Sequence, residues 1–427
     1  MRYISTRRKS PPATFDQAVL RGQAPDGGLY VPVSVPQHPL PSGKDVENLA
    51  DLARQVLPMW IGREVNADLA RDVFSIEIPV IDLGARASEY DGIHVVELFH
   101  GPTGSFKDFA ARFLSRWLST EMPPPEGGRI VLVATSGDTG SAVAEGFSGL
   151  PRTSVVVLYP YEGVSAYQRA QLAKSREGVF PYAVRGSFDD CQRAVKEAFR
   201  DHALSHAGLT SANSINIGRL LPQMLFYFWS AMQVECPDPI FVVPSGNLGN
   251  LCAGLMAGNS SMPDARFIAA TNKNRYLLDY LANSDAEARP VKRSLSNAMD
   301  VAVPSNLERI VRLFGRTDLK TLVSGVSISD KKTRETIHKV WSETGYVADP
   351  HTAVGLKAAL TTKSSRRPRL VMATADPAKY NELVREVTGV KEAIAEEPSE
   401  AIHEEVIDSG LGVLRHLILD IVDRNKT

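Results

Sequence analysis

The chain has few cysteines and no long apolar run. Its three cysteines, Cys191, Cys236 and Cys252, are odd in number and far apart, which favours reduced thiols over a disulfide framework. No cysteine and histidine cluster has metal-ligand spacing. No apolar run is long enough to span a bilayer, and the basic N-terminus lacks the apolar stretch of a signal peptide. We therefore expect a cytoplasmic protein without a metal site.

A strong charge of either sign is also absent. The 48 Lys and Arg residues and 49 Asp and Glu residues give a formal net charge of −1. This balance provides no electrostatic reason to expect binding to nucleic acid or to an anionic membrane. A length of 427 residues is too great for one compact core, so two or three domains are expected.

Strand-like and helix-like patterns alternate along most of the chain. Apolar strand-like runs occur at 94–99, 129–135, 153–159, 181–184, 239–243, 266–270 and 369–373, and helix-like patterns at 105–120, 139–147, 165–175, 188–203 and 249–257. This alternation indicates βαβ units and parallel sheets, and so the α/β class. Two α/β domains, 91–215 and 216–427, fit the pattern, preceded by a segment, 1–90, that mixes Pro- and Gly-rich loops with helical stretches.

Lys107 follows a Gly-Pro-Thr-Gly turn and begins an amphipathic pattern. Apolar residues from Phe106 to Leu118 recur at helical spacing, Ser105 stands where an N-cap is expected, and Asp108 would complete a capping box. Lys107 would then lie in the first turn, where the helix dipole disfavours a cation. A lysine that loses its proton easily is suited to forming a Schiff base. The alternative is an ordinary solvated lysine.

Two further strand-to-helix junctions carry small polar residues. In 135–141, hydroxyl groups and glycines at a helix start would offer N–H groups to an anion such as a carboxylate, or they simply cap the helix. In 244–250, Gly246 and Gly249 would let the backbone approach a phosphate, although the segment lacks the lysine of a P-loop; the alternative is a tight turn.

Three other positions have polar groups with two possible roles. Thr374 would lie at the carboxyl end of a strand, facing a ligand or capping a helix. The stretch 211–219 is rich in hydrogen-bonding groups, and its arginine is suited to bidentate binding of phosphate or carboxylate; the alternative is a polar loop that caps a helix. For His351 we favour a satisfied core histidine over a ligand.

Taken together and in order, these segments resemble the threonine synthase family, of the bacterial and fungal type, within the fold-type II enzymes that use pyridoxal phosphate. The resemblance rests on the motifs Tyr3–Arg7, Asp26–Pro32, Glu97–Thr103, Ser105–Phe109, Ala134–Gly140, Asn213–Asn216, Pro244–Asn247, Asn297–Asp300 and Asp349–Gly355. It implies two open twisted sheets, with 91–215 as a small mobile domain carrying Lys107. It also implies that 216–427 is a large domain carrying the phosphate loop, on which 1–90 packs.

The resemblance also implies roles for individual residues. Lys107 would hold the cofactor and then act as acid and base. Cofactor contacts are implied for Asp138 near the ring oxygen, Thr374 at the pyridine nitrogen, and Gly246, Asn247, Leu248, Gly249 and Asn250 at the phosphate. Substrate contacts are implied for Thr135, Ser136 and Thr139 at the carboxylate and for Asn213, Ser214, Asn216 and Arg219 at the substrate phosphate.

The reaction that the resemblance implies is O-phospho-L-homoserine plus water giving L-threonine plus phosphate. Protons would leave Cα and Cβ, phosphate would leave Cγ, and water would add at Cβ. The partner is then a small molecule, and we expect a monomer or homodimer.

The sequence departs from the family pattern at two places. Within the stretch where this chain has Tyr161, Glu162 and Gly163, family members usually carry two basic residues, which are missing here, and Glu162 adds an acidic one. Family members also usually have a histidine where this chain has Asp376. An acidic group near a phosphate would weaken binding. Two alternatives follow: a related lyase or replacement enzyme acting on another phosphorylated or β-substituted amino acid, as cysteate synthase does, and a non-catalytic threonine-synthase-like binding protein.

Overall fold

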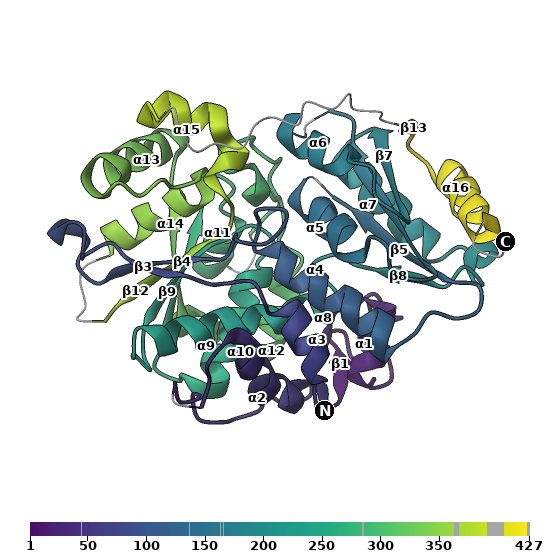
Figure 1. Cartoon of the computed structure of the whole chain (residues 1–427), viewed down its shortest axis with the longest axis horizontal. Helices are drawn as coiled ribbons and strands as arrows, with labels where there is room; N and C mark the ends of the chain where they lie inside the picture. The colour runs from purple at the N-terminus through teal and green to yellow at the C-terminus, as the bar shows by residue number, and fades with distance from the viewer. Residues whose placement is uncertain are drawn as a thin grey trace.

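The computed structural model describes residues 1–43, 45–135, 137–162, 164, 166–283, 286–362, 367–390 and 405–424. It contains two sheets side by side, each flanked by helices, with an N-terminal segment packed beneath them (Figure 1). The α/β class and the two-sheet plan are therefore confirmed.

The small sheet has five parallel strands in the order β13-β7-β6-β5-β8. Its central strands are continuous apolar runs, typical of parallel strands buried on both faces. Alternate residues contribute to separate cores, so that Val131 and Val133 lie in one and Ile130 and Leu132 in another. The strands are β5 (Arg129–Ala134), β6 (Thr153–Pro160), β7 (Val179–Arg185), β8 (Leu209–Ser211) and β13 (Glu405–Asp408); the helices around them are α5 (Asp138–Phe147), α6 (Ala166–Ala173), α7 (Phe188–Ala198), η3 (His202–Leu204) and α16 (Leu411–Arg424).

The large sheet has six strands in the order β11-β10-β9-β12-β4-β3, parallel except for β3. The strands are β3 (Val80–Asp82), β4 (Ile93–Glu97), β9 (Ile240–Pro244), β10 (Arg266–Thr271), β11 (Val323–Ser327) and β12 (Arg369–Ala373). Helices α13, α14 and α15 lie on one side, and α9, α10 and α12 on the other (Figure 1). The helices are α9 (Met224–Gln233), α10 (Gly249–Ser261), α11 (Tyr276–Ala282), η5 (Asn297–Met299), α12 (Leu307–Leu322), α13 (Asp330–Thr344), α14 (Pro350–Thr361), η6 (Pro377–Tyr380) and α15 (Asn381–Thr388).

The N-terminal segment begins with two short antiparallel strands, β1 (Tyr3–Ser5) and β2 (Tyr30–Pro32). It is fixed to the body by burial, and the hydroxyl of Tyr3, which is fully buried, donates to the Trp60 carbonyl at 2.6 Å. One apolar core runs from this segment into both sheets. The other elements of the segment are α1 (Phe15–Arg21), α2 (Leu49–Ile61), α3 (Ala67–Val73) and η1 (Ser88–Tyr90).

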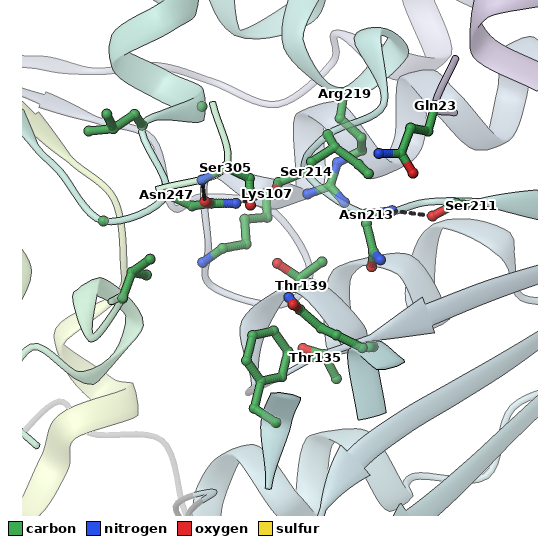
Figure 2. Close-up of a pocket in the computed structure, with 18 of the residues that line it drawn as sticks. Gln23, Lys107, Thr135, Thr139, Ser211, Asn213, Ser214, Arg219, Asn247 and Ser305 are labelled. Atoms are coloured by element: carbon green, nitrogen blue, oxygen red, sulfur yellow. Dashed lines mark hydrogen bonds between the residues drawn. The ribbon is translucent and has the colours of Figure 1, made fainter. Parts of the chain in front are cut away.

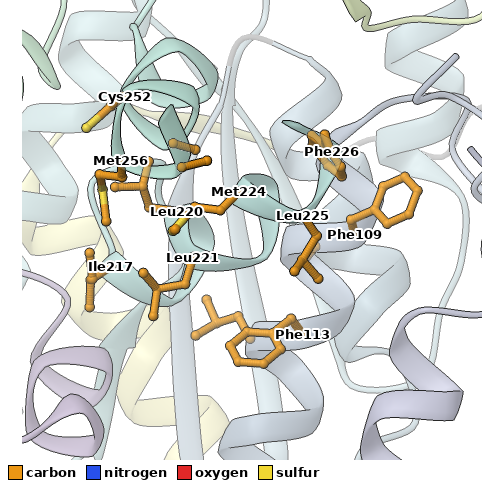
Figure 3. Close-up of a cluster of buried hydrophobic side chains, with 14 of the residues drawn as sticks. Phe109, Phe113, Ile217, Leu220, Leu221, Met224, Leu225, Phe226, Cys252 and Met256 are labelled. Carbon is orange, nitrogen blue, oxygen red and sulfur yellow. The ribbon is translucent and has the colours of Figure 1, made fainter. Parts of the chain in front are cut away.

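The junction between the sheets is apolar. Helix α4 (Lys107–Arg116) continues into the π-helical turn η2 (Trp117–Glu121) and packs on α8 (Ile217–Leu220) and η4 (Leu221–Gln223). Figure 3 shows Phe109 and Phe113 of α4 in the same apolar cluster as Leu221 of η4, with the Phe109 ring beside Phe226 at the start of α9. The face of α4 predicted from its apolar spacing is therefore the buried one, which fixes the direction in which Lys107 leaves the helix.

Two strands pair with strands on the other side of the predicted domain boundary at residue 215. Strand β4 lies within 91–215 but pairs with β12, and β13 lies within 216–427 but pairs with β7. The chain therefore enters the small sheet only after α4 and returns to it at its C-terminal end. In both cases the pairing partner is distant in the sequence, so the pattern of neighbouring residues does not indicate which sheet the strand joins. The movement of one sheet relative to the other stays a prediction.

The three cysteines are free, as predicted, with Cys191 and Cys252 buried. No helix in the described ranges is long and apolar enough to cross a membrane.

Candidate active site

A cavity of about 1030 Å³ lies where the carboxyl ends of strands from both sheets meet. Its walls include the residues that follow β5, β9 and β12, together with the start of α4. Open parallel sheets bind their ligands at this edge. Figure 2 shows Lys107 in the cavity, with Asn247 and Ser214 on one side and Thr135 and Thr139 on the other.

Lys107 is the first residue of α4, as its position in the sequence predicts, but the predicted capping box is wrong. No side chain caps the helix, whose N-cap position is Phe106. The Asp108 carboxylate instead accepts hydrogen bonds from the Thr103 N–H at 2.9 Å and the Thr103 hydroxyl at 2.6 Å. The turn at Gly101 allows this contact, because a Cβ there would lie 2.5 Å from an Asp108 oxygen. Asp108 therefore shapes the turn before Lys107.

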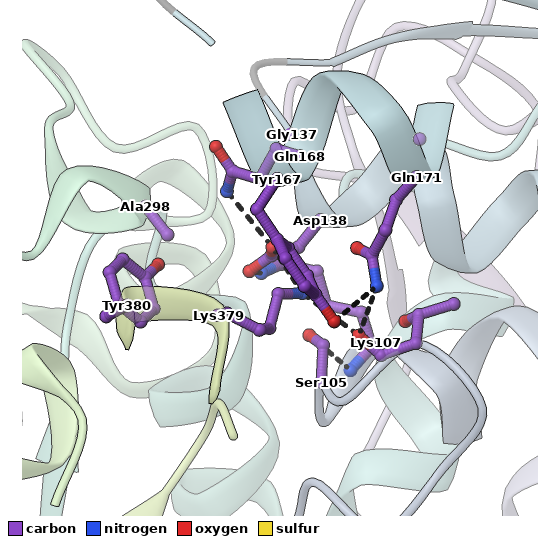
Figure 4. A network of polar contacts seen from close by, with 12 residues as sticks. Ser105, Lys107, Gly137, Asp138, Tyr167, Gln168, Gln171, Ala298, Lys379 and Tyr380 are labelled. Atoms are coloured by element: carbon purple, nitrogen blue, oxygen red, sulfur yellow. Dashed lines mark hydrogen bonds and ion pairs between the residues drawn. The ribbon is translucent and has the colours of Figure 1, made fainter. Parts of the chain in front are cut away.

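The Asp138 carboxylate joins two lysines from different parts of the fold. The Lys107 Nζ lies 3.0 Å from one carboxylate oxygen, and the Lys379 Nζ lies 2.7 Å from the other. Gln168 donates to the second oxygen at 3.1 Å. Figure 4 shows Lys379 reaching from η6 toward Asp138. The contact of Lys379 with Asp138 was not predicted from the sequence, although Lys379 lies in the short helix η6 soon after Thr374.

This contact alters the pKa of both Lys107 and Asp138. Burial lowers the pKa of Lys107, and the positive charges of Lys379 and Arg219 lower it further, against the opposing effect of Asp138. Burial alone would raise the pKa of Asp138, but the two lysines hold it well below its ordinary value. The expectation of an easily deprotonated lysine is supported, and the main cause is burial rather than the helix dipole.

The segment Gly246–Asn250 forms a tight turn into α10. Leu248 adopts a left-handed conformation with φ of 60°, and no side chain caps the helix that begins at Gly249. The first N–H groups of a helix have no partner within it, so this end offers free donors. A Cβ on Gly246 would lie 2.8 Å from the Met299 Cα, so the loop requires a glycine there.

Two asparagines complete this end of the cavity. The Asn250 side-chain oxygen accepts from the Tyr227 hydroxyl at 2.8 Å, while its amide nitrogen is buried without a partner. The Asn247 side chain donates to Ser214 at 2.7 Å and accepts from the Ser305 N–H at 2.5 Å. The turn therefore combines fixed geometry with an unused buried donor, which suits an anion.

Thr374 lies directly after β12 and lines the cavity, as expected. Its carbonyl accepts the Phe106 N–H at 3.1 Å, and Ser105 and Ala375 form an antiparallel bridge. These contacts place Thr374 beside the start of α4 and therefore beside Lys107. Its role at a pyridine nitrogen stays a prediction.

In the loop after β5, Thr135 and Thr139 line the cavity. The Thr135 hydroxyl accepts from the N–H groups of Gly137 at 3.0 Å and Gly140 at 2.9 Å, so it holds the loop in shape. Gly137 has φ of 147°, a conformation that favours glycine. Ser136 lies outside the described residues.

The stretch 211–219 brings only some of its predicted residues to the cavity. Asn213, Ser214 and Arg219 line it, and the Asn213 side-chain oxygen and the Arg219 Nε are buried without partners. Burial lowers the pKa of Arg219 to about 10. Asn216 is not among the lining residues: its buried amide donates to the Val19 and Ser211 carbonyls at 2.8 Å, and its side-chain oxygen caps α8.

His351 lines the cavity but is satisfied, as favoured from the sequence. One ring nitrogen lies 2.6 Å from an Asp349 carboxylate oxygen, and the other accepts the Ala298 N–H at 3.2 Å. The ring therefore carries its proton on the nitrogen that faces Asp349.

Sequence reasoning also missed cavity residues in the N-terminal segment. The stretch 23–27, together with Arg7 and Arg21, lines the cavity. The adjoining motif Asp26–Pro32 was a usable signal, because two successive glycines there allow close backbone approach.

Of the residues that depart from the family pattern, those that the structure describes are not among the residues that line the cavity. Glu162 is exposed, and neither it nor Tyr161 is among the lining residues. Asp376 caps η6 by accepting the Ala378 N–H at 2.8 Å, and its own N–H donates to the Gly104 carbonyl at 3.0 Å. Gly163 lies outside the described residues.

Comparisons with known proteins agree with this geometry. Residues 76–374 match the family model described as pyridoxal-phosphate dependent enzyme, and residues 2–75 match that described as threonine synthase N terminus. The chain is 35% identical to the threonine synthase of Pseudomonas aeruginosa over 92% of each chain, and 36% identical to that of Escherichia coli over 91% of each.

Solved structures are similar over nearly the whole length. The crystal structure of the Escherichia coli threonine synthase has a TM-score of 0.88 at 33% identity, covering 98% of this chain and 100% of that one. The pyridoxal-phosphate-bound threonine synthase of Brucella melitensis has a TM-score of 0.86 at 31% identity, covering 99% of each chain. The chain therefore belongs to the threonine synthases, within the family of pyridoxal-phosphate-dependent enzymes.

Proposed function

We propose that this enzyme converts O-phospho-L-homoserine and water to L-threonine and phosphate, with Lys107 as the residue that holds the cofactor and moves the protons. The observation that carries the proposal is the position of Lys107. Its amine, with a lowered pKa, faces a cavity whose other end is an uncapped helix N-terminus.

The residues present fit pyridoxal phosphate at three places. Lys107 supplies the amine for the aldehyde carbon, and the turn Gly246–Asn250 supplies backbone donors and the unpartnered Asn250 amide for the phosphate. Thr374 supplies a hydroxyl for the pyridine nitrogen. When bound, the cofactor supplies an electron-accepting ring that stabilises the charge left on the substrate carbon.

Lys107 is the base that we propose for the reaction. Its Nζ would take the proton from Cα of the substrate, and the same amine would return a proton after water has added at Cβ. An acid–base group works best when its pKa lies near the working pH. Burial and two neighbouring cations move the pKa of Lys107 in that direction.

Separate residues would bind the two ends of the substrate. Arg219, buried and free of a carboxylate contact in the described part of the chain, would hold the phosphate with Asn213 and Ser214. Thr139, with Ser136 and the loop that Thr135 holds in shape, would bind the carboxylate. Asn216 would act indirectly, by capping the short helix that carries Arg219.

The alternative substrate classes lose their main support. They rest on the change at 161–163 and on Asp376, and Tyr161, Glu162 and Asp376 are not among the residues that line the cavity. The cytoplasmic location, the monomeric or homodimeric state and the closure of the small domain (91–215) over the large one remain proposals of the same kind.

The test is a product assay. The purified protein, loaded with pyridoxal phosphate, is mixed with O-phospho-L-homoserine, and phosphate and threonine are measured together. Equal amounts of the two are expected. Phosphate without threonine, or neither product, would overturn the proposed reaction.

A further inference from the structure

Lys379 is a buried charge that shares the Asp138 carboxylate with Lys107 and has no role in the reaction as described so far. Its side chain is 1% exposed, against 17% for Lys107. Its Nζ is engaged by two acceptors, an Asp138 carboxylate oxygen at 2.7 Å and the Thr103 carbonyl at 3.0 Å. A buried ammonium held this firmly is costly unless its partner stays charged.

The surrounding chain is shaped to bring Lys379 to this position. Asp376 caps the short helix η6, and the Lys379 N–H donates to the Asp376 carbonyl at 3.1 Å. Gly104, with φ of 64°, lies against the same turn, since a Cβ there would lie 3.1 Å from the Asp376 Cβ. The turn before α4 and the turn after β12 therefore cooperate to deliver a second lysine to Asp138.

We propose that Lys379 is a positioning residue for Lys107: it is the standing counter-ion of Asp138, so that the Lys107 amine is free to leave the carboxylate and return during turnover. The proposal rests on the function proposed above. While the Lys107 amine is engaged elsewhere, Lys379 is the lysine that remains on the buried Asp138 carboxylate, and without it the Gln168 amide would be the remaining side-chain donor described here. Lys379 also keeps Asp138 from holding Lys107 in its protonated form.

The charged groups that face Lys107 come from four elements. Asp138 on α5 favours its protonated form, and Lys379 on η6 and Arg219 on α8 oppose it. Asp108, on α4 itself, is turned toward Thr103. Removing the Lys379 charge therefore leaves Asp138 paired with Lys107 alone, and Lys107 should hold its proton to higher pH.

The test measures the reactivity of Lys107 in the full chain stripped of cofactor. Acetic anhydride at low dose acetylates free amines, and mass spectrometry of the peptide that contains Lys107 gives the rate as a function of pH. In Lys379→Met and Lys379→Gln we expect labelling at neutral pH to be about tenfold slower, the change that one pKa unit gives. Lys339→Met, which removes an exposed ion pair between Lys339 on α13 and Glu89 on η1, should label as the wild type does.

A profile in Lys379→Met that overlays the wild type, in protein with unchanged circular dichroism, would overturn the proposal. If the single variants do not fold, Lys379→Met combined with Asp138→Asn removes both buried charges. In that double variant Lys107 should label at least as fast as in the wild type, and slower labelling would contradict the proposal. The labelling experiment contains neither cofactor nor substrate. A negative labelling result would therefore not contradict the proposed reaction, and a negative product assay would not contradict the effect of Lys379 on Lys107.

Discussion

The two ends of the cavity hold their ligand groups by opposite means. At the turn Gly246–Asn250 the donors are backbone N–H groups and side-chain amides, all neutral. Around Lys107, by contrast, two lysines share the buried Asp138 carboxylate. The difference follows from the chemistry at each end. A phosphate that keeps its charge is held well by fixed dipoles, whereas an amine that gains and loses a proton needs compensating charges beside it.

The neutral end is supported from behind by a buried arginine. Arg309 is fully buried and donates to the Tyr30 carbonyl at 3.0 Å, the Ile215 carbonyl at 2.7 Å and the Asn306 side chain. Asn306 in turn donates to the Asn247 carbonyl at 3.0 Å. Arg309 and Asn306 thereby tie the N-terminal segment to the turn at 246–250.

The largest effect is expected at the charged end. Lys107→Ala removes the proposed base and the cofactor's covalent anchor, so turnover should fall by about ten-thousandfold. Borohydride should no longer fix the cofactor to this variant. Steady-state assays and absorption after reduction and dialysis check both points. Retention of both turnover and fixed cofactor would show that another residue does this work.

The next effect is on stability. Asp138→Asn leaves two buried lysines without their carboxylate and should lower the free energy of unfolding by about 3–5 kcal/mol at neutral pH, measured by urea unfolding. The exposed Asp68, paired with Arg71, provides the matched control, and Asp68→Asn should show no resolvable change.

The pH dependence of this stabilisation has a definite sign. The folded-state pKa of Asp138 lies below its ordinary value of 3.8, so the unfolded chain binds the proton more readily. The stabilisation is fully present above the unfolded value and is lost as pH falls through the lower folded value. The gap between the wild type and Asp138→Asn should therefore stay constant down to moderately acidic pH and then narrow. A gap that closes in the neutral range would contradict the assignment.

At the neutral end, Gly246→Ala tests the shape of the backbone rather than charge. The new Cβ would meet the Met299 Cα at 2.8 Å, and overpacking of about 1–3 kcal/mol should weaken cofactor binding roughly tenfold to a hundredfold. Titration with pyridoxal phosphate measures it. Gly127→Ala, where a Cβ meets nothing within 4 Å, should bind as the wild type does. Equal affinities in the two variants would mean that the turn does not hold the phosphate.

The smallest effect is expected outside both ends. Glu162→Lys replaces the acidic residue of the departing loop with a basic one at an exposed position, and surface charges are screened within about 8 Å at physiological salt. The KM for O-phospho-L-homoserine should change by less than about twofold. A decrease of about tenfold would place this loop in the substrate's path and revive the alternative substrates.

Local features of the site were predictable from the sequence. A strand-to-helix junction consists of consecutive residues and can be recognised from the sequence. Lys107 was therefore placed at a helix start, Gly246 between a strand and a helix, and Thr374 at a strand end. Asn216 was expected at the substrate but caps a helix, and an asparagine that caps a helix and one that binds a ligand look alike in sequence.

Non-local features could not be predicted. Lys379 reaches Asp138 only because the two sheets place the end of β12 opposite the start of α5. The strand β4 joins the large sheet because β12, far along the chain, offers it an edge. In each case the contacting residue or strand depends on how the sheets are connected, and the pattern of neighbouring residues gives no information about that.

The most direct measurement identifies the lysine that binds the cofactor. The holoenzyme is reduced with borohydride and digested, and the peptide that carries the pyridoxyl group is sequenced by mass spectrometry. We predict the group on Lys107. Its presence on Lys379, which contacts the same Asp138 carboxylate, would contradict the proposal that Lys107 binds the cofactor while Lys379 stays paired with Asp138.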